Sequence, residues 1–153
     1  MTDQNPQENI PEELRNNVGF LLNKAGRLLR DQISEGLKPM ALSFQEYIIL
    51  RAASAMPAST QQTIGNRLDI DRSTMVELVD RLEERELLNR VRNKEDRRSY
   101  QLLVTLKGQR TLDAAKRLVK KIHKNFLEPL DEKEWEIMQN SLIKLINNWS
   151  TPD

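Results

Sequence analysis

Residues 69–108 read DIDRSTMVELVDRLEERELLNRVRNKEDRRSYQLLVTLKG. The apolar residues after Asp71 recur at three- and four-residue steps, the spacing of an amphipathic helix: Met75, Leu78, Val79 and Leu82. Further along the period changes, and residues 88–92 and 100–104 form two short β-prone runs separated by polar residues. The stretch therefore predicts a helix over about 72–84, followed by a β-hairpin.

The turn of this hairpin is basic, with Lys94, Arg97 and Arg98 within five residues. Nine Lys and Arg face five acids between Arg81 and Arg110, although the whole chain carries a net charge of only +1. A helix sized for a major groove, followed by an arginine-bearing finger suited to a narrow minor groove, is typical of proteins that grip a DNA duplex. DNA binding is therefore the leading interpretation.

The residues before this stretch predict a tail and two helices. Residues 1–10 are polar and aperiodic, which indicates a flexible tail, and apolar residues at helical spacing predict one long helix over 11–36. Ser43 and Glu46 form an S-x-x-E capping box, which opens a second helix that ends near Pro57.

A short third helix completes a helix-turn-helix. Ser59 and Gln62 make a second capping pattern, starting a helix that ends at about Leu68. A short helix that braces a second helix with an apolar inner face and a polar outer face is what a helix-turn-helix requires.

Two long helices follow the hairpin. Thr105 caps a helix that runs to about Phe126, and Pro129 separates it from a last helix opened by Asp131 and Glu134. Their apolar stripes, like that of the first helix, are too long for one small lobe to cover, so two copies of the chain are expected to interlock.

The sequence thus predicts a mainly α fold with a small β-hairpin. A winged helix-turn-helix lobe over 43–105 is flanked by dimerisation helices over 11–36 and 106–150, in one intertwined domain.

Composition excludes several classes of function. The 153 residues contain no cysteine and a single histidine, His123, which excludes thiolate chemistry and gives no basis for a zinc or non-haem iron site. Carboxylates could bind Mg²⁺ or Ca²⁺, but no loop has the spacing that such a site needs. We expect no metal site, no cofactor and no catalytic residues. No phosphate-binding or dinucleotide-binding glycine pattern appears, and no apolar run is long enough to span a membrane. With no signal-peptide pattern, the protein is expected in the cytoplasm.

The quoted stretch resembles the MarR family of bacterial transcription regulators, through residues 71–83 (DRSTMVELVDRLE), Asp96-Arg97-Arg98 and Thr105-Leu106-Lys107-Gly108. The resemblance implies an obligate homodimer on pseudo-palindromic double-stranded DNA near promoters. It also implies repression that a small ligand relieves.

The candidate DNA-binding residues fall into two groups. Those of the recognition helix are Arg72, Ser73, Thr74, Glu77 and Arg81. Those of the wing are Arg90, Arg92, Lys94, Asp96, Arg97 and Arg98. The recognition helix is expected to meet base edges and nearby phosphates, and the wing arginines and lysine to meet phosphates and the minor groove. By the resemblance, Asp96 orients a nearby arginine while Arg97 or Lys94 enters the minor groove. Arg81 and Asp80 have an alternative role, which is pairing within the surface of their own helix.

Three positions depart from the family pattern. Val76 and Glu77 stand where a threonine or a basic residue is common, and Glu86 replaces the usual glycine after the helix. A glutamate on the groove face repels phosphate, but it can accept a hydrogen bond from a cytosine amino group.

By the resemblance, a small-molecule effector would occupy a crevice beside the first helix, lined by Phe44, Tyr47 and Arg51. Core packing is the alternative for Phe44 and Tyr47. Two other functions are alternatives: a helical protein-interaction module with a merely solvated hairpin, and an enzyme, for which no catalytic constellation is visible.

Overall fold

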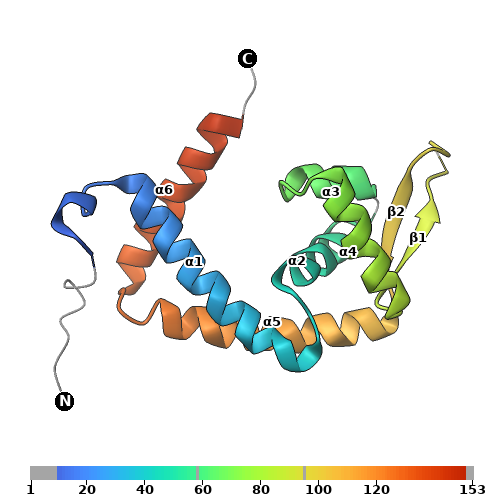
Figure 1. The fold of residues 1–153 in the computed structure, drawn as a ribbon, viewed down its shortest axis with the longest axis horizontal. Coiled ribbons are helices and arrows are strands. Elements are labelled where there is room, and N and C mark those ends of the chain that lie inside the picture. The colour runs from blue at the N-terminus through green and yellow to red at the C-terminus, as the bar shows by residue number, and fades with distance from the viewer. Residues whose placement is uncertain (1–9, 58, 95, 151–153) are drawn as a thin grey trace. The chain divides into compact units, whose positions relative to one another are not determined.

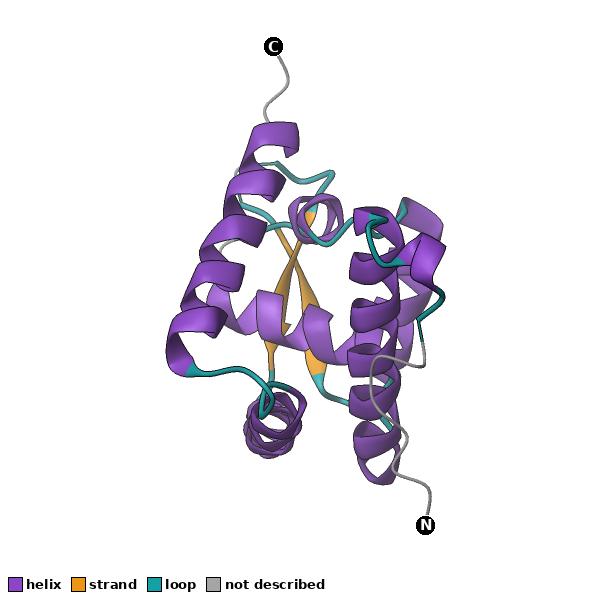
Figure 2. Cartoon of the chain, turned by 90° about the vertical axis from the view of Figure 1, so that its left-hand side faces the viewer, coloured by secondary structure: helices purple, strands orange, loops and turns teal. Residues whose placement is uncertain are grey.

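The structure, a computed structural model, describes residues 10–57, 59–94 and 96–150 (Figure 1). The elements are Glu12–Leu14 (η2, a 3₁₀ turn), Val18–Leu37 (α1), Lys38–Met40 (η3), Phe44–Ala55 (α2), Gln61–Arg67 (α3), Arg72–Glu84 (α4), Leu88–Arg92 (β1), Tyr100–Val104 (β2), Leu106–Phe126 (α5) and Glu132–Ser150 (α6). The predicted fold class, mainly helical with one hairpin, is confirmed (Figure 2). The predicted tail falls almost wholly on residues 1–9, outside the described residues.

The chain divides into two compact units, and the boundary falls within α5, between Val119 and Lys120. The first unit holds everything from η2 to the first two-thirds of α5. The second holds the end of α5 and α6. The finer division into a DNA-binding lobe and dimerisation helices stays a prediction.

The hairpin has the predicted bounds. β1 and β2 pair antiparallel, with Leu88 opposite Val104 and Arg92 opposite Tyr100, and an isolated bridge joins Thr60 to Gln101. Inward-facing Leu88 and Leu102 are fully buried. The sheet therefore closes one side of the core of the first unit.

That core draws side chains from every element of the winged lobe. The largest fully buried residues are Leu37, Ile49, Leu50, Ile64, Met75, Leu78, Leu82, Leu88, Leu102 and Leu112. The four apolar residues predicted for the inner face of α4 are all buried, so the polar side of this helix faces solvent.

Three helical segments end on a residue with a left-handed backbone that is not glycine: Ala41 (φ 51°), Asp69 (φ 53°) and Glu86 (φ 59°). After α4, the Leu87 N–H donates to the Leu82 carbonyl and the Glu86 N–H to the Glu83 carbonyl, which is a Schellman motif. Glu86 thus adopts the conformation for which glycine is usual at this position.

Two predicted helix starts are wrong. The first long helix begins at Val18 rather than near Pro11, because the Asn17 side chain accepts the Phe20 N–H and caps α1 there. The cap of α3 is Thr60 rather than Ser59: Thr60 is held extended by its bridge to Gln101, and its Oγ1 accepts the Thr63 N–H at 3.1 Å.

The predicted starts of α2 and α6 are confirmed by complete capping boxes. The Ser43 N–H donates to Glu46 and the Glu46 N–H to Ser43, and Asp131 and Glu134 exchange the same pair of bonds. No helix in the described part of the chain is both long and apolar enough to cross a membrane.

Candidate nucleic-acid interface

The start of α4 is built around Asp71. Its Oδ1 accepts the Thr74 N–H at 3.0 Å and the Ser73 hydroxyl at 2.7 Å. Hydrogen bonds from the side chain and the backbone of Thr74, and then from Ser73, hold the pKa of Asp71 well below its ordinary value. Because the folded-state pKa is lowered, the charged cap stabilises the fold above the unfolded pKa of about 4 and is lost only in stronger acid.

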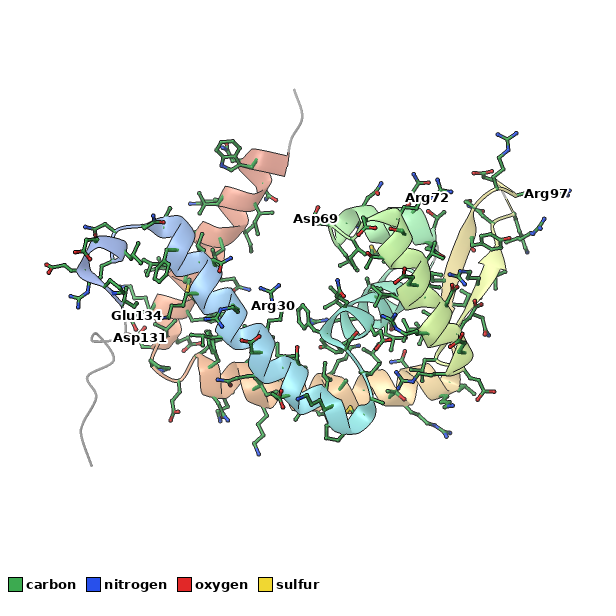
Figure 3. All side chains as sticks on the ribbon, in the orientation of Figure 1. Arg30, Asp69, Arg72, Arg97, Asp131 and Glu134 are labelled. Atoms are coloured by element: carbon green, nitrogen blue, oxygen red, sulfur yellow. The ribbon has the colours of Figure 1, made fainter. Side chains whose placement is uncertain are left out.

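The outward face of α4 is polar and largely acidic. Ser73, Glu77, Asp80 and Glu84 lie in the middle of this face, opposite the buried residues, and all four are exposed. Arg72 is exposed at the first turn, and Figure 3 shows it at the end of the lobe near Asp69. Glu77 therefore stands where a recognition helix would meet base edges.

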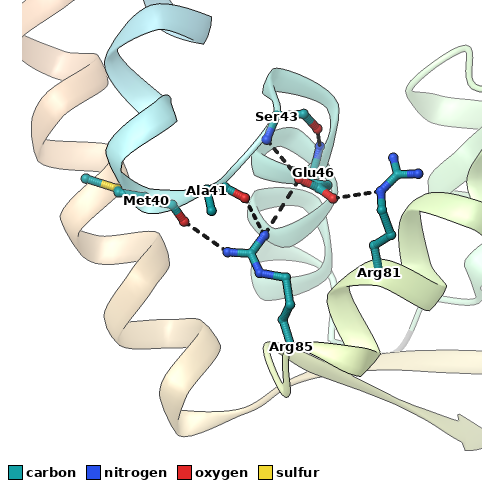
Figure 4. Close-up of polar contacts among 6 residues, drawn as sticks. All are labelled: Met40, Ala41, Ser43, Glu46, Arg81 and Arg85. Atoms are coloured by element: carbon teal, nitrogen blue, oxygen red, sulfur yellow. Dashed lines mark hydrogen bonds and ion pairs between the residues drawn. The ribbon is translucent and has the colours of Figure 1, made fainter.

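Arg81 turns from this face toward α2. Its Nε donates to Glu46 Oε1 at 3.1 Å, while its terminal nitrogens point away from Glu46 (Figure 4). Asp80 pairs with Arg90 at 2.5 Å. Both residues are thus paired within the protein, but their partners lie on α2 and β1 rather than on the surface of α4 itself.

Arg90 is the least exposed of the predicted wing cations. Its Nη1 donates to Asp80 and to Glu83 (2.8 Å), its Nε to Gln61 (2.9 Å) and its Nη2 to the Val76 carbonyl (3.2 Å). All three guanidinium nitrogens are therefore engaged in joining β1 to α3 and α4.

The other cations of the wing are exposed: Arg92, Lys94, Arg97 and Arg98. In the described part of the chain, no ion pair involves any of them. Figure 3 shows Arg97 at the hairpin tip. The Asp96 carboxylate accepts the Arg98 backbone N–H at 3.0 Å, so it orders the turn through the main chain rather than through an arginine side chain.

A cavity of about 500 Å³ separates the two predicted DNA-binding elements. Residues from α3, α4, β1 and β2 line it, among them Arg72 at the start of α4, together with Arg98 of the hairpin turn. The cavity thus brings a cation of the helix start and a cation of the wing to one surface.

The three residues predicted for the effector crevice differ in exposure. Tyr47 is buried, Phe44 is half-buried and Arg51 is exposed, with its Nη1 donating to the Tyr47 hydroxyl at 3.4 Å. They line neither the cavity described above nor a second one, which lies between Met40, Arg85 and α5. Their role in binding an effector stays a prediction.

Sequence reasoning did not identify the partners that organise this surface. Gln61 contacts Arg90 across 29 residues, and Glu46 contacts Arg81 across 35. The four-residue spacing of Arg81 and Arg85 indicates one shared helix face, but nothing in the sequence indicates the carboxylate that they share.

A helix-turn-helix, a solvent-facing α4 and a hairpin with exposed cations at its tip define a winged helix-turn-helix protein. The model of the MarR family matches residues 42–100. Among curated proteins, the HTH-type transcriptional regulator SarZ of Staphylococcus haemolyticus (strain JCSC1435) is 26% identical over 135 residues, covering 88% of this chain and 90% of SarZ.

Two solved structures extend the likeness. CouR from Rhodococcus jostii RHA1, bound to p-coumaroyl-CoA, superposes with a TM-score of 0.80 at 28% identity, covering 94% of this chain and 99% of that one. The transcriptional repressor CouR bound to a 23-mer DNA duplex gives a TM-score of 0.81 at 30% identity, covering 88% of this chain and 95% of that one. The chain belongs to the MarR family of transcription regulators.

Proposed function

We propose that this protein is a homodimeric, sequence-specific DNA-binding repressor of a pseudo-palindromic promoter site, released by a small-molecule ligand. Two features of the structure together carry the proposal. The polar face of α4 is exposed, and the wing has exposed cations that form no ion pair in the described chain. The DNA-bound CouR structure supports it, because that relative is 30% identical over most of its length.

The contacts divide between base edges and phosphates. We assign Glu77 and Ser73 to base edges; the Ser73 hydroxyl donates to Asp71, so its oxygen is left to accept. Arg72, Thr74 and the terminal nitrogens of Arg81 are assigned to nearby phosphates, and Arg92, Lys94, Arg97 and Arg98 to phosphates and the minor groove. Arg90 is assigned to bracing the wing, since its donors are already engaged.

Exposed apolar side chains support the homodimer. α1 exposes Val18, Leu22 and Leu28, and α6 exposes Ile137, Met138, Ile143, Leu145, Ile146 and Trp149. Trp149 is 85% exposed in the single chain. Apolar surface of this extent marks an interface, and a second copy would also supply the second recognition helix that a palindrome requires.

The proposed relief by a ligand acts on the distance between the two recognition helices of the dimer. A ligand that favours a dimer with a different distance between recognition helices would lower DNA affinity. Arg51 and Phe44 offer a cation and an aromatic face for an anionic aromatic ligand, and CouR is bound to p-coumaroyl-CoA. Displacement of the protein from its selected duplex by p-coumaroyl-CoA, with coenzyme A alone as the control, tests this part.

Selection of bound duplexes from a random DNA pool tests the main proposal, with the affinities of the winners measured at two salt concentrations. Enrichment of a two-fold symmetric site with a steep loss of affinity in salt is the expected result. No enriched motif and weak binding at low salt would favour a helical protein-interaction module instead.

The wing assignment has a matched control. Arg97→Ala with Arg98→Ala is expected to abolish tight binding while dimerisation and helix content survive. Arg110→Ala with Arg117→Ala removes the same charge from exposed positions of α5 and is expected to bind like the wild type. Equal affinity of the two double variants would contradict the assignment.

A further inference from the structure

Glu46 is the one charged residue with a buried side chain in the described part of the chain. A buried carboxylate is costly unless it is paired and hydrogen-bonded. Its Oε2 accepts the Ser43 N–H at 2.8 Å as half of the capping box, so the carboxylate cannot turn away without uncapping α2. Glu46 is therefore a fixed anion at the start of α2.

Two arginines from the end of α4 converge on this anion (Figure 4). Arg81 Nε lies 3.1 Å from Oε1, and Arg85 Nη1 lies 3.9 Å from Oε2. Glu46 thus holds the last turn of α4 through two arginines that are one helical turn apart, and this restricts the tilt of the helix as well as its position.

Arg85 carries the connection onward to the corner between α1 and α2. Its Nη1 donates to the Ala41 carbonyl at 2.5 Å and its Nη2 to the Met40 carbonyl at 2.9 Å. Ala41 is the left-handed residue that ends η3, directly after α1. The recognition helix is therefore tied through one ion-pair cluster to the chain that leaves the expected dimerisation helix.

We propose that Glu46 is a positioning residue that fixes the tilt of α4 through Arg81 and Arg85, and thereby sets the half-site spacing that the dimer accepts. The inference rests on the proposed function. The 13 residues of α4 span about 20 Å at about 1.5 Å per residue. A tilt of about 10° about the last turn would move Arg72 by roughly 3.4 Å, one base-pair step along a duplex.

The test compares affinities for the selected operator, for the same half-sites moved apart or together by one base pair, and for a duplex with a single half-site. The wild type is expected to bind the shifted operators much more weakly. Glu46→Gln, and separately Arg85→Gln, should reduce that spacing penalty by at least about fivefold, the low end of typical coupling between sites. Affinity for the single half-site should change by no more than about twofold, because no DNA-contacting group is removed.

Ser43→Ala is the matched control, since it weakens the same helix cap but leaves the carboxylate and both arginines in place. It should keep the wild-type spacing penalty. A Glu46→Gln variant that folds and keeps the wild-type penalty would overturn the inference, as would equal relaxation in Ser43→Ala. Arg85 is partly exposed, so Arg85→Gln decides the matter if Glu46→Gln does not fold. A wild type that selects no symmetric site would overturn the proposed function and this inference with it.

Discussion

Glu86 holds a backbone conformation that costs an L-residue with a Cβ roughly 1–2 kcal/mol. Its side chain is mostly exposed, and the ion pair to Lys107 is a surface contact that is expected to contribute little. We expect Glu86→Gly to stabilise the protein by about 0.5–1 kcal/mol, the strain relieved less the added flexibility of the unfolded chain. Urea unfolding measures this. Glu86→Ala removes the ion pair but keeps the strain, so equal stability of the two variants would contradict the argument.

For single residues, side-chain contacts within a few residues of one another could be predicted from the sequence, and contacts between residues far apart in the chain could not. The Ser43–Glu46 box and the Asp71 cap were predicted, because their atoms lie within three residues of one another. The spacing of Ser59 and Gln62 predicts the wrong cap for α3, because the bridge that holds Thr60 extended comes from Gln101, 41 residues further along the chain. The pairing of Glu46 with Arg81 depends on how α2 packs against α4, which no local pattern encodes.

Among the elements, the wing is fixed to the recognition helix by Arg90. Arg90→Met would leave Asp80 and Glu83 facing each other without their cation. We expect a loss of about 2 kcal/mol of stability, the usual size for hydrogen bonds to charged groups, and weaker DNA binding with an unchanged salt dependence. Thermal unfolding and affinities across a salt series measure the two effects.

Arg92→Met, two residues along β1, is the control for this prediction. Arg92 is exposed and pairs with no carboxylate in the described chain, so stability should hold while the slope of log affinity against log salt falls by about 1. The bracing role of Arg90 is contradicted if Arg92→Met loses stability and Arg90→Met instead lowers the salt dependence of DNA binding.

The contact between α5 and the turn before β1 leaves no space at Gly108. A Cβ there would lie 1.8 Å from the Leu87 carbonyl oxygen, which also accepts the Thr105 N–H. We expect Gly108→Ala to cost about 3 kcal/mol, at the upper end of overpacking effects. Gly26→Ala, within α1 and with nothing near its added Cβ, should instead gain about 0.5–1 kcal/mol. Chemical denaturation that ranks the two variants in the opposite order would refute this.

The elements themselves were largely predictable. The hairpin and α4 have the bounds that the change of period indicated, because alternation and helical spacing are both local patterns. The start of the first helix is predicted too early. Its apolar spacing extends back to Leu14, although Asn17 caps the helix and α1 begins only at Val18.

For the whole molecule, α6 carries an apolar stripe, of which the single chain leaves Met138, Leu145, Ile146 and Trp149 exposed. Trp135, Met138, Leu142, Leu145, Ile146 and Trp149 fall within roughly 100° of the helix circumference at 100° per residue. Ile143 lies outside this arc on the same helix and is also about half exposed. If a second copy covers the stripe, position 146 is buried in the dimer and position 143 is not.

We therefore expect Ile146→Glu to dissociate the dimer at micromolar concentration, because a carboxylate at a buried interface position is left without a partner. Ile143→Glu should leave the dimer intact. Sedimentation equilibrium of both variants measures the outcome, and DNA binding should follow it, since one lobe reaches one half-site. A monomeric wild type, or two variants with the same association constant, would show that this stripe is not the dimer interface.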